Sequence, residues 1–252
     1  MIGDPKQLYI GRIMAREPLP PESYLNQVPA VRYLMERGEV ALHAPVTFLV
    51  GENGSGKSTL LEAIAVSYGF NAEGGTRNFS FSTYATHSDL HRHIRLAKYR
   101  YPRDGFYLRA ESFYNVATDI ERMDAEPGPG THVILNYGSV SLHAQSHGES
   151  FMAVVENRLR GNGLYIFDEP EAALSPMRLM DLLVQIDRLV RADSQFIIAT
   201  HSPILMAYPH AELLELGQDG IRSVSYRETE HFACTLRFLE NPERMLGYLL
   251  ED

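Results

Sequence analysis

A glycine-rich segment at residues 51–58 constrains this chain more than any other part of its sequence. It reads GENGSGKS and fits the pattern G-x-x-x-x-G-K-[ST] without a mismatch. An apolar, β-branched run of strand length (residues 46–50) precedes it, and apolar residues at helical spacing follow it. Between a strand and a helix, such glycines let backbone N–H groups turn inward and cradle a polyphosphate. The segment therefore predicts a nucleotide-binding loop rather than a chance match in a glycine-rich turn.

The side chains of this loop have separate expected roles. Lys57 would reach the β- and γ-phosphates of ATP, and the Ser58 hydroxyl would bind Mg²⁺. The whole segment and the residue after it are the expected nucleotide-binding positions: Gly51, Glu52, Asn53, Gly54, Ser55, Gly56, Lys57, Ser58 and Thr59. ATP and Mg²⁺ are thus the predicted cofactors.

Two further motifs follow short apolar runs of strand length. Residues 164–167 run into Asp168, Glu169 and a proline, and residues 196–199 lead to His201. Asp168 would orient the Mg²⁺ shell, while Glu169 would polarise a water for attack on the γ-phosphate. His201 would lie at the carboxyl edge of the sheet, where open α/β sheets bind ligands, and would contact the γ-phosphate. Lys57, Glu169 and His201 are therefore the predicted catalytic residues.

The composition sets the broad class. With 252 residues and 44% hydrophobic side chains, the chain can form a substantial core. The formal net charge of −9 argues against a surface built mainly to coat nucleic acid. A single cysteine and the lack of a signal-like or 18-residue apolar run predict a cytoplasmic protein without membrane insertion.

The alternation of strands and helices predicts an α/β P-loop fold with a mixed, mainly parallel sheet flanked by helices. We expect a single domain over residues 1–252, with a core lobe of about 1–75 and 150–252 and an inserted, mainly helical lobe of about 76–149. Within this layout, residues 40–43 are expected to pair with the strand before the phosphate loop. Residues 89–98 and 236–250 are expected to be helical.

The three motifs in this order resemble those of ABC-type ATPases, in particular the SMC and RecF-like branch and its small stand-alone bacterial relatives. This resemblance covers most of residues 40–210. It implies ATP hydrolysis and an ATP-dependent homodimer in which two protomers enclose two ATP molecules. A role in DNA repair or defence would follow from the resemblance alone.

The resemblance also implies two further site elements. The first is a signature loop of the Leu-Ser-Gly-Gly-Gln kind, which contacts the γ-phosphate bound by the other protomer. Residues 144–150 match it at Ser146 and Gly148, while His147 replaces the first glycine and Glu149 the glutamine. The second is a glutamine that follows a strand near Mg²⁺, and Glu111 is the best positional match to it.

Other observations leave alternatives open. The run from Arg92 to Arg109 has six basic residues with aromatic residues among them, which suits either a nucleic-acid contact or a solvated surface. Histidines at 87, 91, 93, 143 and 147 have spacings that allow a metal, although no cysteines accompany them. Instead of an autonomous ATPase, the chain could be a nucleotide-gated module that controls an effector protein, or the nucleotide-binding subunit of a membrane transporter.

Overall fold

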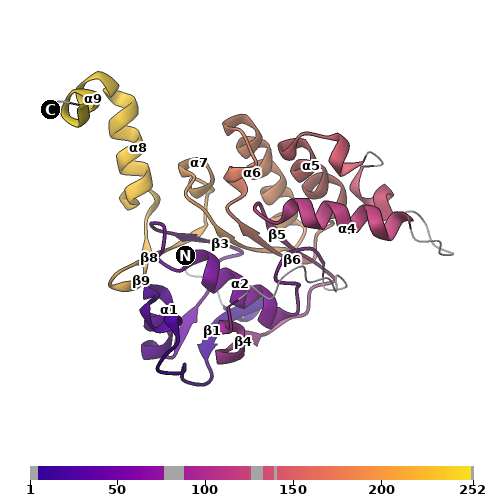
Figure 1. Ribbon diagram of the computed structural model, residues 1–252, viewed down its shortest axis with the longest axis horizontal. Coiled ribbons are helices and arrows are strands. Elements are labelled where there is room, and N and C mark those ends of the chain that lie inside the picture. Colours follow the sequence, from indigo (N-terminus) through magenta and orange to yellow (C-terminus); the bar gives the residue numbers. More distant parts are fainter. Residues whose placement is uncertain (1–4, 77–87, 126–132, 139–140, 251–252) are drawn as a thin grey trace.

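The computed structural model describes residues 5–76, 88–125, 133–138 and 141–250, and a six-stranded sheet forms its centre (Figure 1). The strands lie in the order β5-β6-β7-β3-β8-β9, and all except β9 are parallel to their neighbours. Their bounds are β3 Val46–Val50, β5 Asp104–Arg109, β6 Gly163–Asp168, β7 Gln195–Ala199, β8 Glu212–Gly217 and β9 Gly220–Val224. The predicted mixed, mainly parallel sheet is therefore confirmed.

Helices cover both faces of this sheet. On one face, α1 (Pro29–Arg37) and α2 (Lys57–Tyr68) pack against alternate residues of the strands, among them Leu49 and Ile166. On the other face, α4 (Phe113–Ala125), α5 (His147–Ala153), α6 (Pro176–Arg191) and α7 (Pro203–Met206) contribute to a second core that includes Phe48 and Phe167. Every residue of β3, β6 and β7 is buried, as expected for parallel strands covered on both sides.

A small antiparallel sheet lies next to α2. It has the order β2-β1-β4, with β1 Ile10–Ala15, β2 Glu39–Ala41 and β4 Ile94–Lys98. The prediction that residues 40–43 pair with β3 is wrong, because β7 and β8 occupy both edges of that strand. The predicted helix at residues 89–98 is also wrong beyond the short α3 (Leu90–His93). Buried Ile94 and Leu96 alternate with exposed Arg95, which is the pattern of a strand.

The predicted final helix at residues 236–250 is two helices, α8 (Glu230–Glu240) and α9 (Pro242–Leu250). Proline lacks the N–H that a continuous helix needs, so the break falls at Asn241 and Pro242. Both helices extend away from the sheet at the upper left of Figure 1, and neither has a buried residue. Leu239, Leu249 and Leu250 are among their exposed apolar side chains.

Residues expected to form the inserted lobe also take part in the two sheets. Within the predicted range of about 76–149, β4 joins the small sheet and β5 forms the edge of the large one. Of the helices of that range, α4 and the start of α5 contribute to the same core as α6, whereas α3 packs against α2 on the other face. A separate inserted lobe stays a prediction, and its proposed range contains one strand of each sheet. Within the described residues, no helix combines the length and apolar character that a membrane-spanning segment requires.

Candidate nucleotide-binding site

The phosphate loop connects β3 to α2, and its shape requires glycine at two positions. Gly51 has a φ of 133° and Gly56 a φ of 100°, which L-residues rarely adopt. A Cβ on Gly51 would lie 2.2 Å from the carbonyl oxygen of Leu216, and one on Gly56 would lie 2.5 Å from Val28. Any side chain at either position would therefore displace the loop from β8 or α1.

Lys57, the first residue of α2, folds back over this loop. Its ammonium group donates hydrogen bonds to the carbonyl oxygens of Gly51, at 2.9 Å, and Glu52, at 3.0 Å. The residue is only 4% exposed, and burial lowers the pKa of Lys57, although the nearby carboxylates of Glu169 and Asp168 oppose that shift. The Ser55 hydroxyl in the same loop is buried without a hydrogen-bond partner. The loop thus contains the ammonium of Lys57 and the unpaired hydroxyl of Ser55. Both groups can donate hydrogen bonds to a phosphate group.

Ser58 and Asp168 meet although 110 residues separate them in sequence. The Ser58 hydroxyl donates a 2.9 Å hydrogen bond to Oδ1 of Asp168, which is the last residue of β6. Burial raises the pKa of Asp168 to about 6, against the opposing influence of Arg109 and the Ser58 hydroxyl. Mg²⁺ prefers hard oxygen ligands and keeps several waters, so a hydroxyl and a carboxylate beside a phosphate loop fit this ion. No group of three or more His, Cys, Asp or Glu side chains among the described residues is placed to hold a metal.

Glu169 follows in a strained backbone conformation. Its φ of 49° and ψ of 55° are left-handed, and its N–H donates to the carbonyl oxygen of Ala199 at the end of β7. One carboxylate oxygen lies 3.3 Å from Nε2 of His201. The side chain is 37% exposed, so water can reach it. The sharp turn after β6 therefore aims Asp168 at Ser58 and Glu169 at His201.

His201 has polar neighbours on three sides. Besides Glu169 at Nε2, its backbone N–H donates to the buried carboxylate of Glu171, and its Nδ1 lies 2.8 Å from Nε2 of His231 in α8. Burial, followed by the charge of Lys57, lowers the pKa of His201. The imidazole is therefore held close to the phosphate loop in a neutral form at neutral pH.

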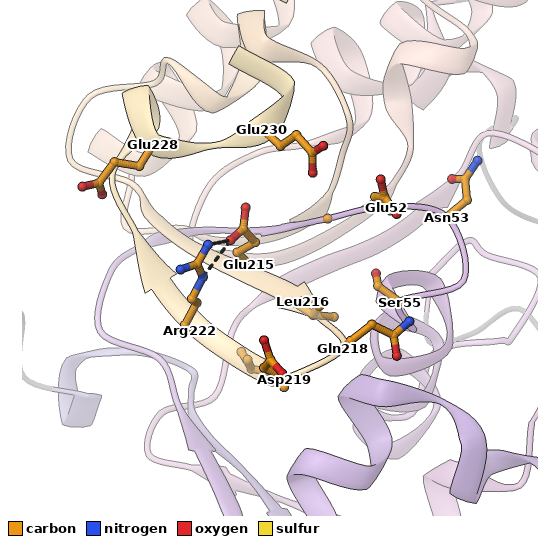
Figure 2. Close-up of a pocket in the computed structure, with 14 residues that line it drawn as sticks. Glu52, Asn53, Ser55, Glu215, Leu216, Gln218, Asp219, Arg222, Glu228 and Glu230 are labelled. Atoms are coloured by element: carbon orange, nitrogen blue, oxygen red, sulfur yellow. Dashed lines mark hydrogen bonds and ion pairs between the residues drawn. The ribbon is translucent and has the colours of Figure 1, made fainter. Parts of the chain in front are cut away.

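A pocket of about 410 Å³ adjoins the phosphate loop on the side of the β8–β9 hairpin (Figure 2). Arg222 is the basic residue that lines it, and it is already paired with Glu215. Five carboxylates also line it: Glu52, Glu215, Asp219, Glu228 and Glu230. A polyphosphate would be repelled there. The phosphates consequently fit better on the side of the loop that carries Lys57 and Ser58.

The predicted signature residues form the N-terminus of α5. Ser146 caps the helix and accepts from the Glu149 N–H at 3.4 Å, while the Glu149 carboxylate accepts from the Ser146 N–H at 2.9 Å. The Ser146 hydroxyl also donates to that carboxylate at 2.6 Å. A Cβ on Gly148 would lie 2.9 Å from the carbonyl oxygen of Ala173. These hydrogen bonds stay within the first turn of α5, so the structure does not join the loop to Lys57 in the same chain.

Glu111 lies at the periphery of the Asp168 region. Its side chain is 81% exposed and 3.5 Å from Arg109. Arg109 itself lies closer to the site, with Nε at 3.6 Å from Asp168 and a 2.9 Å ion pair to Glu62 of α2. Metal ligation by Glu111 stays a prediction.

Sequence reasoning missed four polar residues of this region: Glu62, Arg109, Glu171 and His231. One sequence signal could have indicated Arg109 and Glu62. Each is a charged residue next to apolar residues of its own strand or helix. His231 carried no such signal, because only the path of the chain after β9 brings it to His201. Of the histidines with metal-like spacing, His87 lies outside the described residues, and His143 lies 3.1 Å from the Thr118 hydroxyl.

Comparison with known protein families gives two partial matches. One family model, described as an AAA domain, matches residues 30–113. A second, also described as an AAA domain and linked to the AbiEii toxin of type IV toxin–antitoxin systems, matches residues 140–207. No curated protein matches the chain.

Two solved structures share the fold of this chain. MJ1267, an ATP-binding cassette of an ABC transporter, superposes with a TM-score of 0.54 at 16% identity, over 92% of this chain and 98% of that one. The cbiO1 protein of Clostridium perfringens is part of the ABC transporter complex cbiONQ. It superposes with a TM-score of 0.51 at 16% identity, over 96% of this chain and 100% of that one. The chain has the fold of an ABC-type ATPase cassette.

Proposed function

We propose that this cassette binds ATP with Mg²⁺ and hydrolyses it to ADP and phosphate. The observation that carries the proposal is the convergence of five side chains at the carboxyl ends of three adjacent parallel strands. Lys57 and Ser58 follow β3, Asp168 ends β6 with Glu169 directly after it, and His201 follows β7. Ligands of open α/β sheets bind at this edge.

Each residue then has a role that its position supports. The loop N–H groups and Lys57 bind the β- and γ-phosphates. The Lys57 ammonium then replaces its hydrogen bonds to the carbonyl oxygens of Gly51 and Glu52 with charge-assisted bonds to phosphate oxygens. Ser58 and Asp168 would hold Mg²⁺, which neutralises charge on the phosphates when bound. Glu169 accepts a proton from the water whose oxygen bonds to the γ-phosphorus as the bond to the ADP oxygen breaks. His201 Nε2–H donates to the γ-phosphate.

We further propose that ATP drives two copies together. In this arrangement Ser146 and the Gly148 N–H of one copy contact the γ-phosphate held by the other. Two features support it: Ser146 and Glu149 are exposed, and they bond to each other rather than to the phosphate loop of their own chain. An N-terminal helical turn with a hydroxyl is a suitable anion site.

A second candidate is a nucleotide-gated module with little turnover of its own. The exposed apolar side chains on α8 and α9 favour it, since they give an effector protein a surface to bind. The toxin–antitoxin description of the second matching family points in the same direction. Multiple turnovers of phosphate release by the isolated protein would exclude this candidate.

A third candidate is the nucleotide-binding subunit of a membrane transporter. Co-purification with a membrane protein would favour it.

The Glu169→Gln variant tests the hydrolytic proposal. Loss of the general base should reduce turnover by about 10²- to 10⁴-fold. ATP binding should persist, and a dimer should accumulate in size-exclusion chromatography with ATP and Mg²⁺. Glu156→Gln, an exposed carboxylate of the helical turn after α5, is the matched control. Unchanged turnover in Glu169→Gln would contradict the assignment of the base.

A further inference from the structure

The C-terminal helix α8 contributes a histidine to the site. His231 lies in the first turn of α8, and its Nε2 is 2.8 Å from Nδ1 of His201, with the two ring centroids 4.9 Å apart. The start of α8 is fixed by Thr229, which is fully buried, donates to the carbonyl oxygen of Tyr226 and accepts from the N–H of Phe232. The contact is therefore made by a well-anchored turn.

The chemistry of two facing imidazoles decides which nitrogen carries the proton. A neutral imidazole has one donor and one acceptor nitrogen, so a hydrogen bond between two neutral rings needs one of each. For His201 to donate from Nε2 toward the γ-phosphate or Glu169, its Nδ1 must be the acceptor. His231 must then donate from Nε2. Burial and the Lys57 charge lower the pKa of both rings, which keeps them neutral at neutral pH.

We propose that His231 is a positioning residue that fixes His201 in the tautomer with the proton on Nε2. The same bond limits rotation of the His201 ring, so that Nε2–H stays directed at the phosphate side of the site. This inference rests on the proposed function for the role of His201. It also links α8 and α9 to the nucleotide site, because displacement of α8 would remove the donor that sets the His201 tautomer.

Two substitutions in the full-length chain separate positioning from packing. His231→Gln keeps an N–H donor at a similar distance from the backbone, whereas His231→Leu keeps comparable bulk without a donor. The His201 ring nitrogens are followed by ¹⁵N NMR without nucleotide. The wild type and His231→Gln should show the Nε2–H form, and His231→Leu should show a mixture with the Nδ1–H form. An identical tautomer in His231→Leu and the wild type would overturn the inference.

Steady-state kinetics gives the second measurement. His231→Leu should lower turnover about tenfold with little change in ATP affinity, and His231→Gln should retain turnover within about threefold. Equal losses in both variants would indicate packing alone and overturn the inference. Full activity in His231→Leu would overturn it as well, while leaving the proposed function intact if Glu169→Gln is inactive. Failure of the wild type to bind ATP would instead contradict the proposed function, and the NMR result would still decide the tautomer.

Discussion

The phosphate loop and the signature loop differ in where their polar groups find partners. Lys57 bonds to the backbone of its own loop, and Ser58 bonds to Asp168, which a distant strand supplies. Ser146 and Glu149 instead satisfy each other within one exposed helical turn. The difference teaches that Lys57, Ser58 and Asp168 meet within one chain, whereas in the proposed dimer the capping loop would reach a nucleotide only on the other copy.

In the proposed dimer, the signature loop would have to change its hydrogen bonds before it could contact a nucleotide. The Ser146 hydroxyl donates to Glu149 at 2.6 Å, and this bond, with the backbone N–H bond, lowers the pKa of the Glu149 carboxyl. In the proposed dimer, a charged carboxylate would therefore lie on the path of the approaching γ-phosphate. The phosphate loop has no such obstacle, because its cation is already directed into the loop.

The largest effect on this comparison is expected from Lys57→Ala. Removing the ammonium deletes charge-assisted hydrogen bonds to phosphate of about 1.5–3 kcal/mol, which is roughly a 10- to 100-fold loss of ATP affinity. Isothermal titration calorimetry measures it, with Lys6→Ala as a control that removes the same charge from an exposed N-terminal turn. Equal affinities for the two variants would mean that the loop does not bind the phosphates through Lys57.

A smaller effect is expected from Ser146→Ala. If this hydroxyl contacts a nucleotide on the other copy, its loss should weaken ATP-dependent dimerisation by about tenfold. ATP binding by the monomer should not change. Analytical ultracentrifugation with ATP-bound Glu169→Gln as the background measures the dimer. Ser175→Ala is the matched control, since Ser175 caps α6 with a similar 3.4 Å bond. Equal weakening by both variants would remove the signature role.

Glu149→Gln should act in the opposite direction. Glutamine can replace glutamate in a capping box, so the helix start should persist. Removal of the negative charge should strengthen ATP-dependent dimerisation about threefold, as expected for an exposed charge interaction. The same ultracentrifugation experiment at low and high salt measures the change, which should shrink at high salt. A weaker dimer would show that the carboxylate supports the interface.

A further expected effect concerns stability alone. Ser146→Ala and Ser175→Ala each remove an N-cap, which costs about 1 kcal/mol of unfolding free energy. Urea unfolding without nucleotide should therefore give similar midpoints for the two variants, both slightly below the wild type. A much larger loss for Ser146→Ala would indicate that the capping box, rather than an interface, explains its effect on dimerisation.

Sequence patterns predicted the elements whose signals are local. The strands before Gly51 and Asp168 are continuous apolar runs, and Ser175 followed by a proline indicated the start of α6. Errors arose where the deciding contact is distant. β2 pairs with β1 because β3 has no free edge, and Ile94 to Lys98 is a strand because β1 lies beside it. The motifs predicted that Ser58, Asp168 and His201 gather at one edge of the sheet, whereas the positions of Arg109 and His231 depend on tertiary packing.

The bond between Ser58 and Asp168 joins segments 110 residues apart, and this distance has a consequence for how the protein matures. A chain in which β3 and β6 have not yet assembled would lack this bond, so we expect ATP with Mg²⁺ to bind most tightly once the central strands are in place. By mass action, the nucleotide would then favour the finished state over its precursors. Protease resistance acquired on addition of ATP would accordingly serve as a mark of correctly completed folding.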